Sequence, residues 1–161
     1  MLKSNTIWNH NEWGTCGISL SESSNNNKIF NNSISNNDAG IHLWRSSNNR
    51  IFNNDIFSNN VGVSPEDSSN NNEIFNNDIK SNSFGVILGW GSTNNTIYHN
   101  NFIKNKVHAS FLNCFFNCWS RNYWDNWVGF GPKVIWGTIW IVIPWISFDW
   151  HPAKEPWEGE K

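Results

Sequence analysis

Short apolar segments recur along the first two thirds of the chain at intervals of 22 or 23 residues. A Gly-Ile or Gly-Val pair marks each copy, at Gly17-Ile18, Gly40-Ile41, Gly62-Val63 and Gly85-Val86. Each copy holds three apolar segments of two to four residues, separated by turns rich in Asn, Ser and Gly. These segments are too short for ordinary helices, and no Asn-Gly or Asp-Gly pair indicates a tight hairpin. The pattern therefore predicts one turn of a parallel β-solenoid per copy.

Three apolar columns run in phase through the copies and predict one continuous core. They are Ile29, Ile51, Ile74 and Ile97; Ile34, Ile56, Ile79 and Phe102; and Cys16, Ala39, Val61, Phe84 and Val107. The third column makes Cys16 a predicted core residue. A partial copy before the four full copies and a degenerate one after them predict about five turns. A disordered Asn/Ser-rich segment would not keep this register, and a leucine-rich repeat would have a different consensus spacing.

Asparagine explains most of the unusual composition. All 31 Asn lie between Asn5 and Asn126. Two further columns consist of Asn32, Asn54, Asn77 and Asn100, and of Asn37, Asn59, Asn82 and Asn105. Asn tolerates left-handed turns, and its amide can bond to the same residue in the next turn. We therefore expect side-chain ladders with a structural role.

The C-terminal part has a different composition, with eight of the 12 Trp at or after Trp119. We expect one domain, with a repeat body over 1–127 and a Trp-rich cap over 128–161 that packs on the last turn. An anchor at a membrane interface is the alternative, but the charges of the tail show no basic bias. The longest apolar run, 134–146, is too short to span a bilayer, which needs roughly 20 residues. The net charge of −2 gives no basic surface for nucleic acid.

Candidate chemistry lies in the turn that follows the Gly-Ile segment, where polar and aromatic residues differ between copies. Stacking places Glu22, Arg45 and Asp67 above one another. The predicted ligand-binding residues are His42, Trp44, Arg45, Glu66, Asp67 and Trp90. Aromatic faces and charged groups of this kind can bind a polysaccharide, although an alternating charge ladder needs no ligand.

An enzyme at the same place is the competing hypothesis. A polysaccharide lyase or glycoside hydrolase would use Glu22, Arg45, Glu66 and Asp67. Arg45 between the carboxylates would keep them ionised, which suits a general acid poorly. We therefore expect a non-catalytic protein and no cofactor.

Two further clusters are candidate sites. Phe30, Phe52, Phe75 and Tyr98 predict an aromatic stripe that is either exposed for binding or half-buried. The weak candidates for metal ligands are His99, His108, Cys114 and Cys118. The spacing of the two cysteines is not typical of a metal site, so no metal is predicted.

The segment Asn-Asn-Arg-Ile-Phe-Asn-Asn-Asp-Ile-Phe-Ser-Asn-Asn (48–60), followed by Gly-Val, resembles the right-handed parallel β-helix repeats of NosD-like proteins. Asn-Tyr-Trp-Asp-Asn-Trp (122–127) is similar to the segment that often closes such arrays, many of them in archaeal surface proteins. The resemblance implies an extracellular, cell-surface or periplasmic module. Such a module would bind polysaccharide or serve as structure in the cell envelope. The family's copper-related accessory role is a further alternative.

Overall fold

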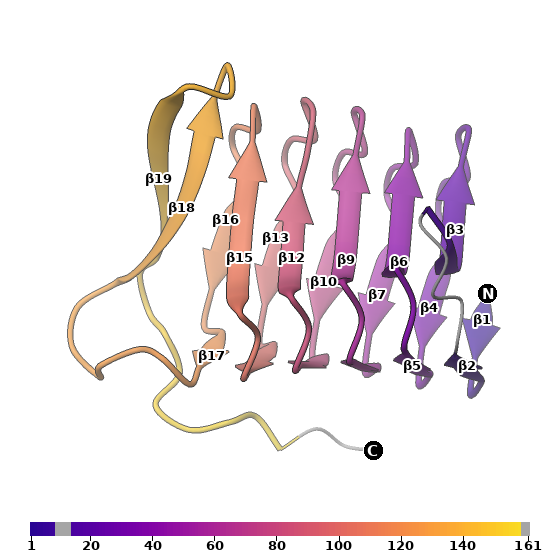
Figure 1. Ribbon diagram of the computed structural model, residues 1–161, viewed down its shortest axis with the longest axis horizontal. Helices are drawn as coiled ribbons and strands as arrows, with labels where there is room; N and C mark the ends of the chain where they lie inside the picture. Colours follow the sequence, from indigo (N-terminus) through magenta and orange to yellow (C-terminus); the bar gives the residue numbers. More distant parts are fainter. Residues whose placement is uncertain (9–13, 159–161) are drawn as a thin grey trace.

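Each repeat winds once around a common axis and adds one strand to each of three faces (Figure 1). The computed structural model describes residues 1–8 and 14–158. The first face contains β3 (Cys16–Ser21), β6 (Ala39–Trp44), β9 (Val61–Glu66), β12 (Phe84–Leu88) and β15 (Val107–Leu112). The second contains β1 (Leu2–Lys3), β4 (Lys28–Phe30), β7 (Arg50–Phe52), β10 (Glu73–Phe75), β13 (Thr96–Tyr98) and β16 (Cys118–Ser120). The third contains β2 (Thr6–Trp8), β5 (Ser33–Ser35), β8 (Asp55–Phe57), β11 (Asp78–Lys80), β14 (Asn101–Ile103) and β17 (Tyr123–Trp124).

Strands on each face pair in parallel with their equivalents in the neighbouring turns, which confirms the predicted parallel β-helix. Ile51 pairs with Ile74, and Ile56 pairs with Ile79. These four side chains are fully buried, as the first two apolar columns predict. The solenoid has about six turns rather than five, because the partial N-terminal copy already forms β1 and β2.

The third predicted core column points outward instead. At Gly40 a Cβ atom would lie 2.6 Å from the carbonyl oxygen of Gly62 and 3.0 Å from Cγ2 of Ile56. The glycine thus faces the interior, where a neighbouring turn leaves no room for a side chain, and the residue before it faces out. Cys16 and Ala39 are accordingly half-buried, so the prediction of Cys16 as a core residue is wrong.

Asparagine ladders line the corners between faces. Oδ1 of Asn77 accepts hydrogen bonds from the backbone N–H and the Nδ2 of Asn54, both at 3.0 Å. Both predicted ladders form in this way. A third, not predicted, runs through Asn27, Asn49, Asn72, Asn95 and Asn117. The first ladder ends at Asp149, which is fully buried.

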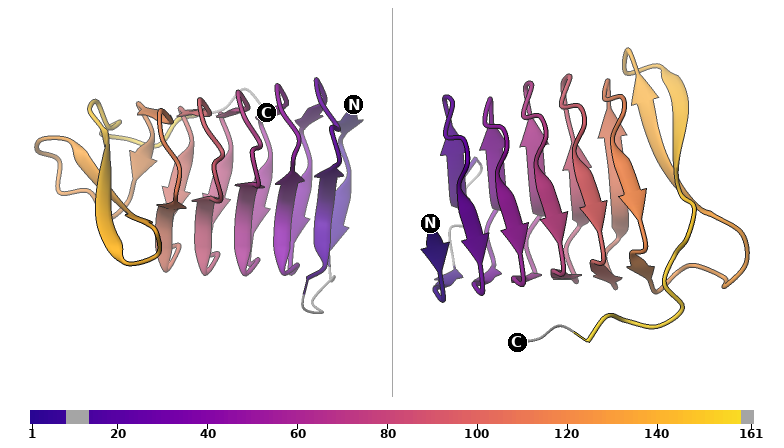
Figure 2. Two further views of the ribbon diagram at one scale, coloured as in Figure 1. Left: turned by 90° about the horizontal axis from the view of Figure 1, so that it is seen from above. Right: turned by 180° about the vertical axis from the view of Figure 1, so that it is seen from behind.

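An antiparallel hairpin of β18 (Lys133–Ile139) and β19 (Ile143–Asp149) closes the last turn (Figure 2). β18 pairs with β15 and β19 pairs with β16, which joins the first and second faces into one 13-stranded sheet. Trp119 and Trp124 fill the interior at this end. The tail was predicted to cover the last turn with its Trp side chains. That cap is not confirmed, because Trp136 and Trp140 are 65% and 75% exposed. The described ranges contain no helix long and apolar enough to cross a membrane.

Candidate functional site

The predicted ligand-binding residues gather where β6 and β9 end and the following turns begin. Trp44 pairs with Glu66 in the sheet register. Arg45 and Asp67 follow directly, each with a positive φ of 48–50°. Trp90 occupies the equivalent turn position after β12, with a φ of 47°, and is 48% exposed.

Arg45 organises the charged part of the site. Its Nε donates to Oδ2 of Asp67 at 2.6 Å, and its Nη1 lies 3.9 Å from Oε1 of Glu22. Its Cζ lies 5.5 Å from the centre of the Trp44 ring, a cation–π distance. The structure therefore places Glu22, Arg45 and Asp67 in the stacked order that the sequence predicts. Both carboxylates lie beside the same guanidinium. The three side chains together offer hydrogen-bonding groups with little net charge.

His42 forms the second part of the site. Its Nε2 lies 3.8 Å from Oε2 of Glu66, and the hydroxyl of Ser64 donates to the other oxygen of that carboxylate. Hydrogen bonds with Cys16 and then Glu66 outweigh burial and raise the pKa of His42 to about 9. The imidazole is therefore protonated at neutral pH.

Glu66 is correspondingly held in its ionised form. The hydrogen bond with His42, and a weaker contribution from Ser64, lower the pKa of the Glu66 carboxyl despite its partial burial. Its side chain leans over Gly89 of the next turn, since a Cβ there would lie 3.1 Å from Cγ of Glu66. A carboxylate kept ionised in this way is poorly suited to donate a proton to a leaving group.

The two tryptophans lie in neighbouring columns rather than in one. Trp44 shares its column with Glu66, whereas Trp90 follows Arg45 and Asp67 in theirs. The structure gives an aromatic group on each side of a paired charged cluster.

Cys16 is the residue of this site that sequence analysis missed. It was assigned to the core because Ala39 and Val61 share its column. The signal that could have found it was the glycine after each member of that column. An inward glycine forces the preceding side chain out toward His42.

The weak metal candidates do not come together. His108 is buried, with Nε2 2.7 Å from Asp125 and Nδ1 3.2 Å from Asn105, while His99 packs on Trp157 with 4.2 Å between ring centres. Cys114 is buried and bonded to a backbone carbonyl, and Cys118 is exposed. Residues 1–8 and 14–158 contain no group of three His, Cys, Asp or Glu side chains that could hold a metal ion.

The aromatic column is half-buried rather than an open stripe. Neighbouring rings among Phe30, Phe52, Phe75 and Tyr98 stack with 4.9–5.0 Å between centres. The guanidinium of Arg50 covers two of them, 5.6 Å from Phe52 and 5.0 Å from Phe75. The stacking accounts for this column without a ligand.

A family model and solved structures match this chain. A family model described as periplasmic copper-binding protein (NosD) matches residues 1–129. A sequence search of curated proteins found no match. The solved structure of a mutant of the periplasmic alginate epimerase AlgG is similar, with a TM-score of 0.67 and 22% identity, over 85% of this chain and 31% of the epimerase chain. A double mutant of the epimerase gives a TM-score of 0.59 and 21% identity, over the same shares of the two chains. This chain thus spans about a third of the epimerase's length, and the likeness shows the fold.

Proposed function

The chain belongs to the NosD family, and we propose that it is a non-catalytic module of the cell envelope that binds a polysaccharide. The family description and the structural neighbour both refer to periplasmic proteins, which supports a location outside the cytoplasm. The ligand would bind at the ends of β6, β9 and β12. The observation that carries the proposal is the clustering of Trp44, Arg45 and Glu66 with Trp90 on adjacent turns.

The geometry suits the two kinds of surface that a sugar presents. An exposed indole such as Trp90 can pack against the apolar face of a pyranose ring. The paired groups of Arg45 and Asp67 and of His42 and Glu66 can bond to hydroxyls without leaving a buried charge unpaired. Because positive and negative groups nearly balance, we propose a neutral rather than a strongly anionic chain as the ligand.

Titration calorimetry against neutral and uronate-containing polysaccharides tests the proposal. We expect saturable binding of a neutral polysaccharide and a loss of at least about fivefold in affinity for Trp90→Ala, since one aromatic contact contributes about 1–3 kcal/mol. Trp136→Ala is the matched control, because that indole is exposed on β18 away from the site. Equal losses in both variants, or no binding across the panel, would contradict the proposal. The second result would favour a purely structural role.

Catalysis at the same residues is the alternative, and the same samples test it. New reducing or unsaturated ends in the polysaccharide would indicate a hydrolase or lyase. In that case Glu66→Gln and Asp67→Asn should lower turnover more than affinity. The lowered pKa of Glu66 argues against its service as a general acid.

Copper, which the family description names, does not fit the described residues. Cys16 and His42 contact each other, but residues 1–8 and 14–158 hold no group of three such side chains that could bind a metal ion, and His108 already uses both ring nitrogens within the protein.

A further inference from the structure

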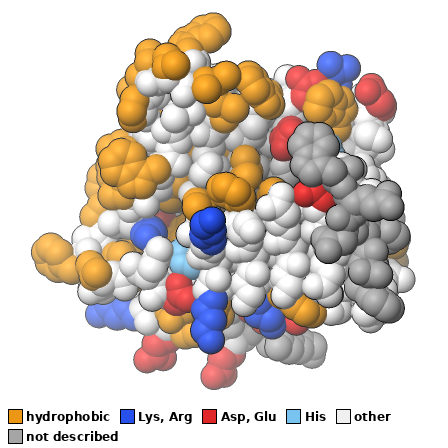
Figure 3. Space-filling view, in the orientation of Figure 1, with side chains coloured by type: hydrophobic (Ala, Val, Ile, Leu, Met, Phe, Trp, Pro, Cys, Tyr) orange, Lys and Arg blue, Asp and Glu red, His pale blue; other side chains and the backbone are white. Residues whose placement is uncertain are grey.

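Large apolar side chains remain exposed at the end of the solenoid where the hairpin turns. Figure 3 shows hydrophobic side chains gathered over the hairpin. We call this surface the hairpin end, and its residues are Phe115, Phe116, Trp136, Trp140, Ile141, Val142, Ile143, Trp145 and Ile146. Phe116 and Val142 are 84% and 78% exposed. Contiguous exposure of this kind marks an interaction surface.

The backbone conformation of these turns does not require apolar side chains. Left-handed positions in this chain are mostly Asn or Ser, and one such column consists of Asn26, Asn48, Asn71 and Asn94. In the last turn the same position is Phe116, with a φ of 58°. At the hairpin tip Trp140 and Ile141 have φ values of 52° and 65°. A β-branched residue is strained in this conformation, so a polar residue would form the same turn at lower cost.

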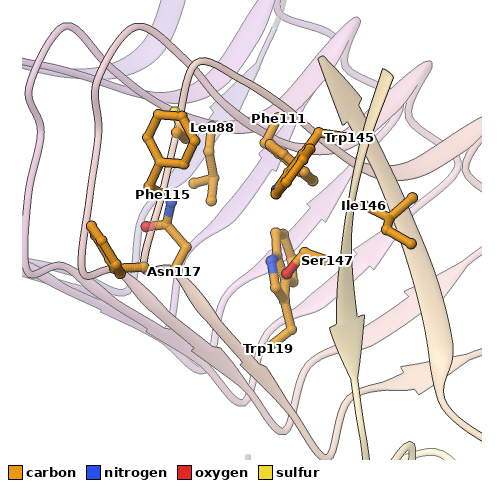
Figure 4. A pocket seen from close by; sticks show the side chains of 10 residues that line it. Leu88, Phe111, Phe115, Asn117, Trp119, Trp145, Ile146 and Ser147 are labelled. Atoms are coloured by element: carbon orange, nitrogen blue, oxygen red, sulfur yellow. The ribbon is translucent and has the colours of Figure 1, made fainter. Parts of the chain in front are cut away.

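The hairpin end is held in place rather than loosely attached. The backbone N–H of Trp140 donates to Oδ1 of Asn113 at 2.6 Å, and the N–H of Asn113 donates to the carbonyl of Thr138 at 2.9 Å. Phe115 and Trp145 line one cavity of about 240 Å³ below the tip (Figure 4). The β15–β16 turn and the hairpin therefore form a single apolar surface.

Charge and shape favour a lipid partner over a protein partner. Residues 134–148 contain no charged side chain. Trp136 lies opposite Ile146 on one face of the hairpin, and Trp145 lies on the other face, opposite Gly137. All three large side chains are at least 41% exposed. An uncharged surface of this kind offers a protein partner no ion pairs, whereas the boundary of a lipid bilayer accommodates exposed Trp and aliphatic side chains directly.

We propose that the hairpin end inserts into the interface of a phospholipid bilayer. Trp140 to Ile143 would enter the boundary between headgroups and acyl chains, at a depth of about 5–10 Å. The hairpin keeps its own backbone hydrogen bonds up to the Ile139–Ile143 pair, as an apolar medium requires. Trp136 and Trp145, four residues or more from Ile141, would lie at the level of the headgroups, where tryptophan is favoured. Because the tip carries no basic residue, binding does not depend on anionic lipid or low salt.

Flotation of the full chain with phosphatidylcholine vesicles, at 0.1 and 0.5 M salt, tests this proposal. We expect the wild-type protein to float with the vesicles at both salt concentrations. The double variant Ile141→Asn with Val142→Ser should lower the vesicle partition coefficient by at least about tenfold. Asn suits a left-handed turn, so the melting temperature of this variant should not fall.

Phe130→Ser is the matched control, because Phe130 is 88% exposed in the β17–β18 loop, away from the hairpin tip (Figures 1 and 2). It should leave vesicle binding unchanged. The proposal is overturned if the wild-type protein stays with the lipid-free fraction, or if Phe130→Ser reduces flotation as much as the tip variant does. It is equally overturned if sedimentation shows a dimer that the tip variant abolishes while vesicles bind nothing, because a second copy is then the partner. None of these outcomes depends on the polysaccharide site.

Discussion

Asp149 ends the first asparagine ladder with an arrangement that only a carboxylate satisfies. Its Oδ2 accepts from the N–H of Asn122 at 2.9 Å, from the Nδ2 of the same residue at 3.1 Å and from Nε1 of Trp124 at 3.1 Å. Its Oδ1 accepts from the N–H groups of Arg121 at 3.0 Å and His151 at 3.2 Å. All five partners are donors, so the site needs two acceptor oxygens. Asp149→Asn keeps the size and removes one of them.

We expect Asp149→Asn to destabilise the fold by about 2–4 kcal/mol. The remaining carbonyl oxygen can serve the donors of Asn122 and Trp124, but the new NH₂ group then faces the N–H groups of Arg121 and His151. Each partly buried donor left without an acceptor costs about 1–2 kcal/mol. Urea unfolding at constant m measures the change.

The matched control is Glu73→Gln, which removes one charge from a surface pair with Arg50, where both side chains are about 45% exposed. Such a pair contributes about 1 kcal/mol or less. If Asp149→Asn changes the free energy of unfolding no more than Glu73→Gln does, the reasoning about the ladder end is refuted.

Three further predictions concern buried polar groups. Asn77→Ala should cost about 3–5 kcal/mol in urea unfolding, because the backbone N–H and Nδ2 of Asn54 lose an acceptor and two carbonyls lose a donor; a loss below about 1 kcal/mol would contradict this. Proton NMR should show His42 titrating near pH 9, and Glu66→Gln should lower that pKa. The stability that His42 contributes should be complete below about pH 6.5 and disappear as the pH rises through about 9. Burial lowers the pKa of His108, so the contribution of His108 to folding stability should be complete above about pH 6.5 and be lost as the pH falls through the folded-state pKa. Urea unfolding at pH 5 and pH 8 measures this loss. If His108→Gln is as stable as the wild-type protein at both pH values, the prediction is contradicted.

The candidate site was largely accessible from sequence because its residues are placed by register. Once the repeat length is known, Arg45 must lie between Glu22 and Asp67, since equivalent residues stack one strand apart. The hydrogen bonds of Ser64 and His42 to Glu66 could not be predicted, because they depend on rotamers at the end of β9. The outward position of Cys16 depends on how closely the backbone of Gly17 approaches the turn of Gly40, where a Cβ would lie 2.8 Å from the carbonyl oxygen.

The sequence by itself determined the solenoid, its repeat length, two apolar columns and two asparagine ladders. In a periodic fold, equivalent positions meet the same structural requirement every 22 or 23 residues, so the same residue types recur there. Only the tertiary structure decided how the C-terminal segment folds and packs. This segment is not repeated, so no equivalent positions in other turns indicate which of its side chains are buried. The need of a solenoid to cover its open end favoured a cap that packs on the last turn. In the structure Trp119 and Trp124 already fill the end of the core. The hairpin pairs with β15 at Gly137 and Thr138 and with β16 at Asp149, and most of its large side chains stay exposed.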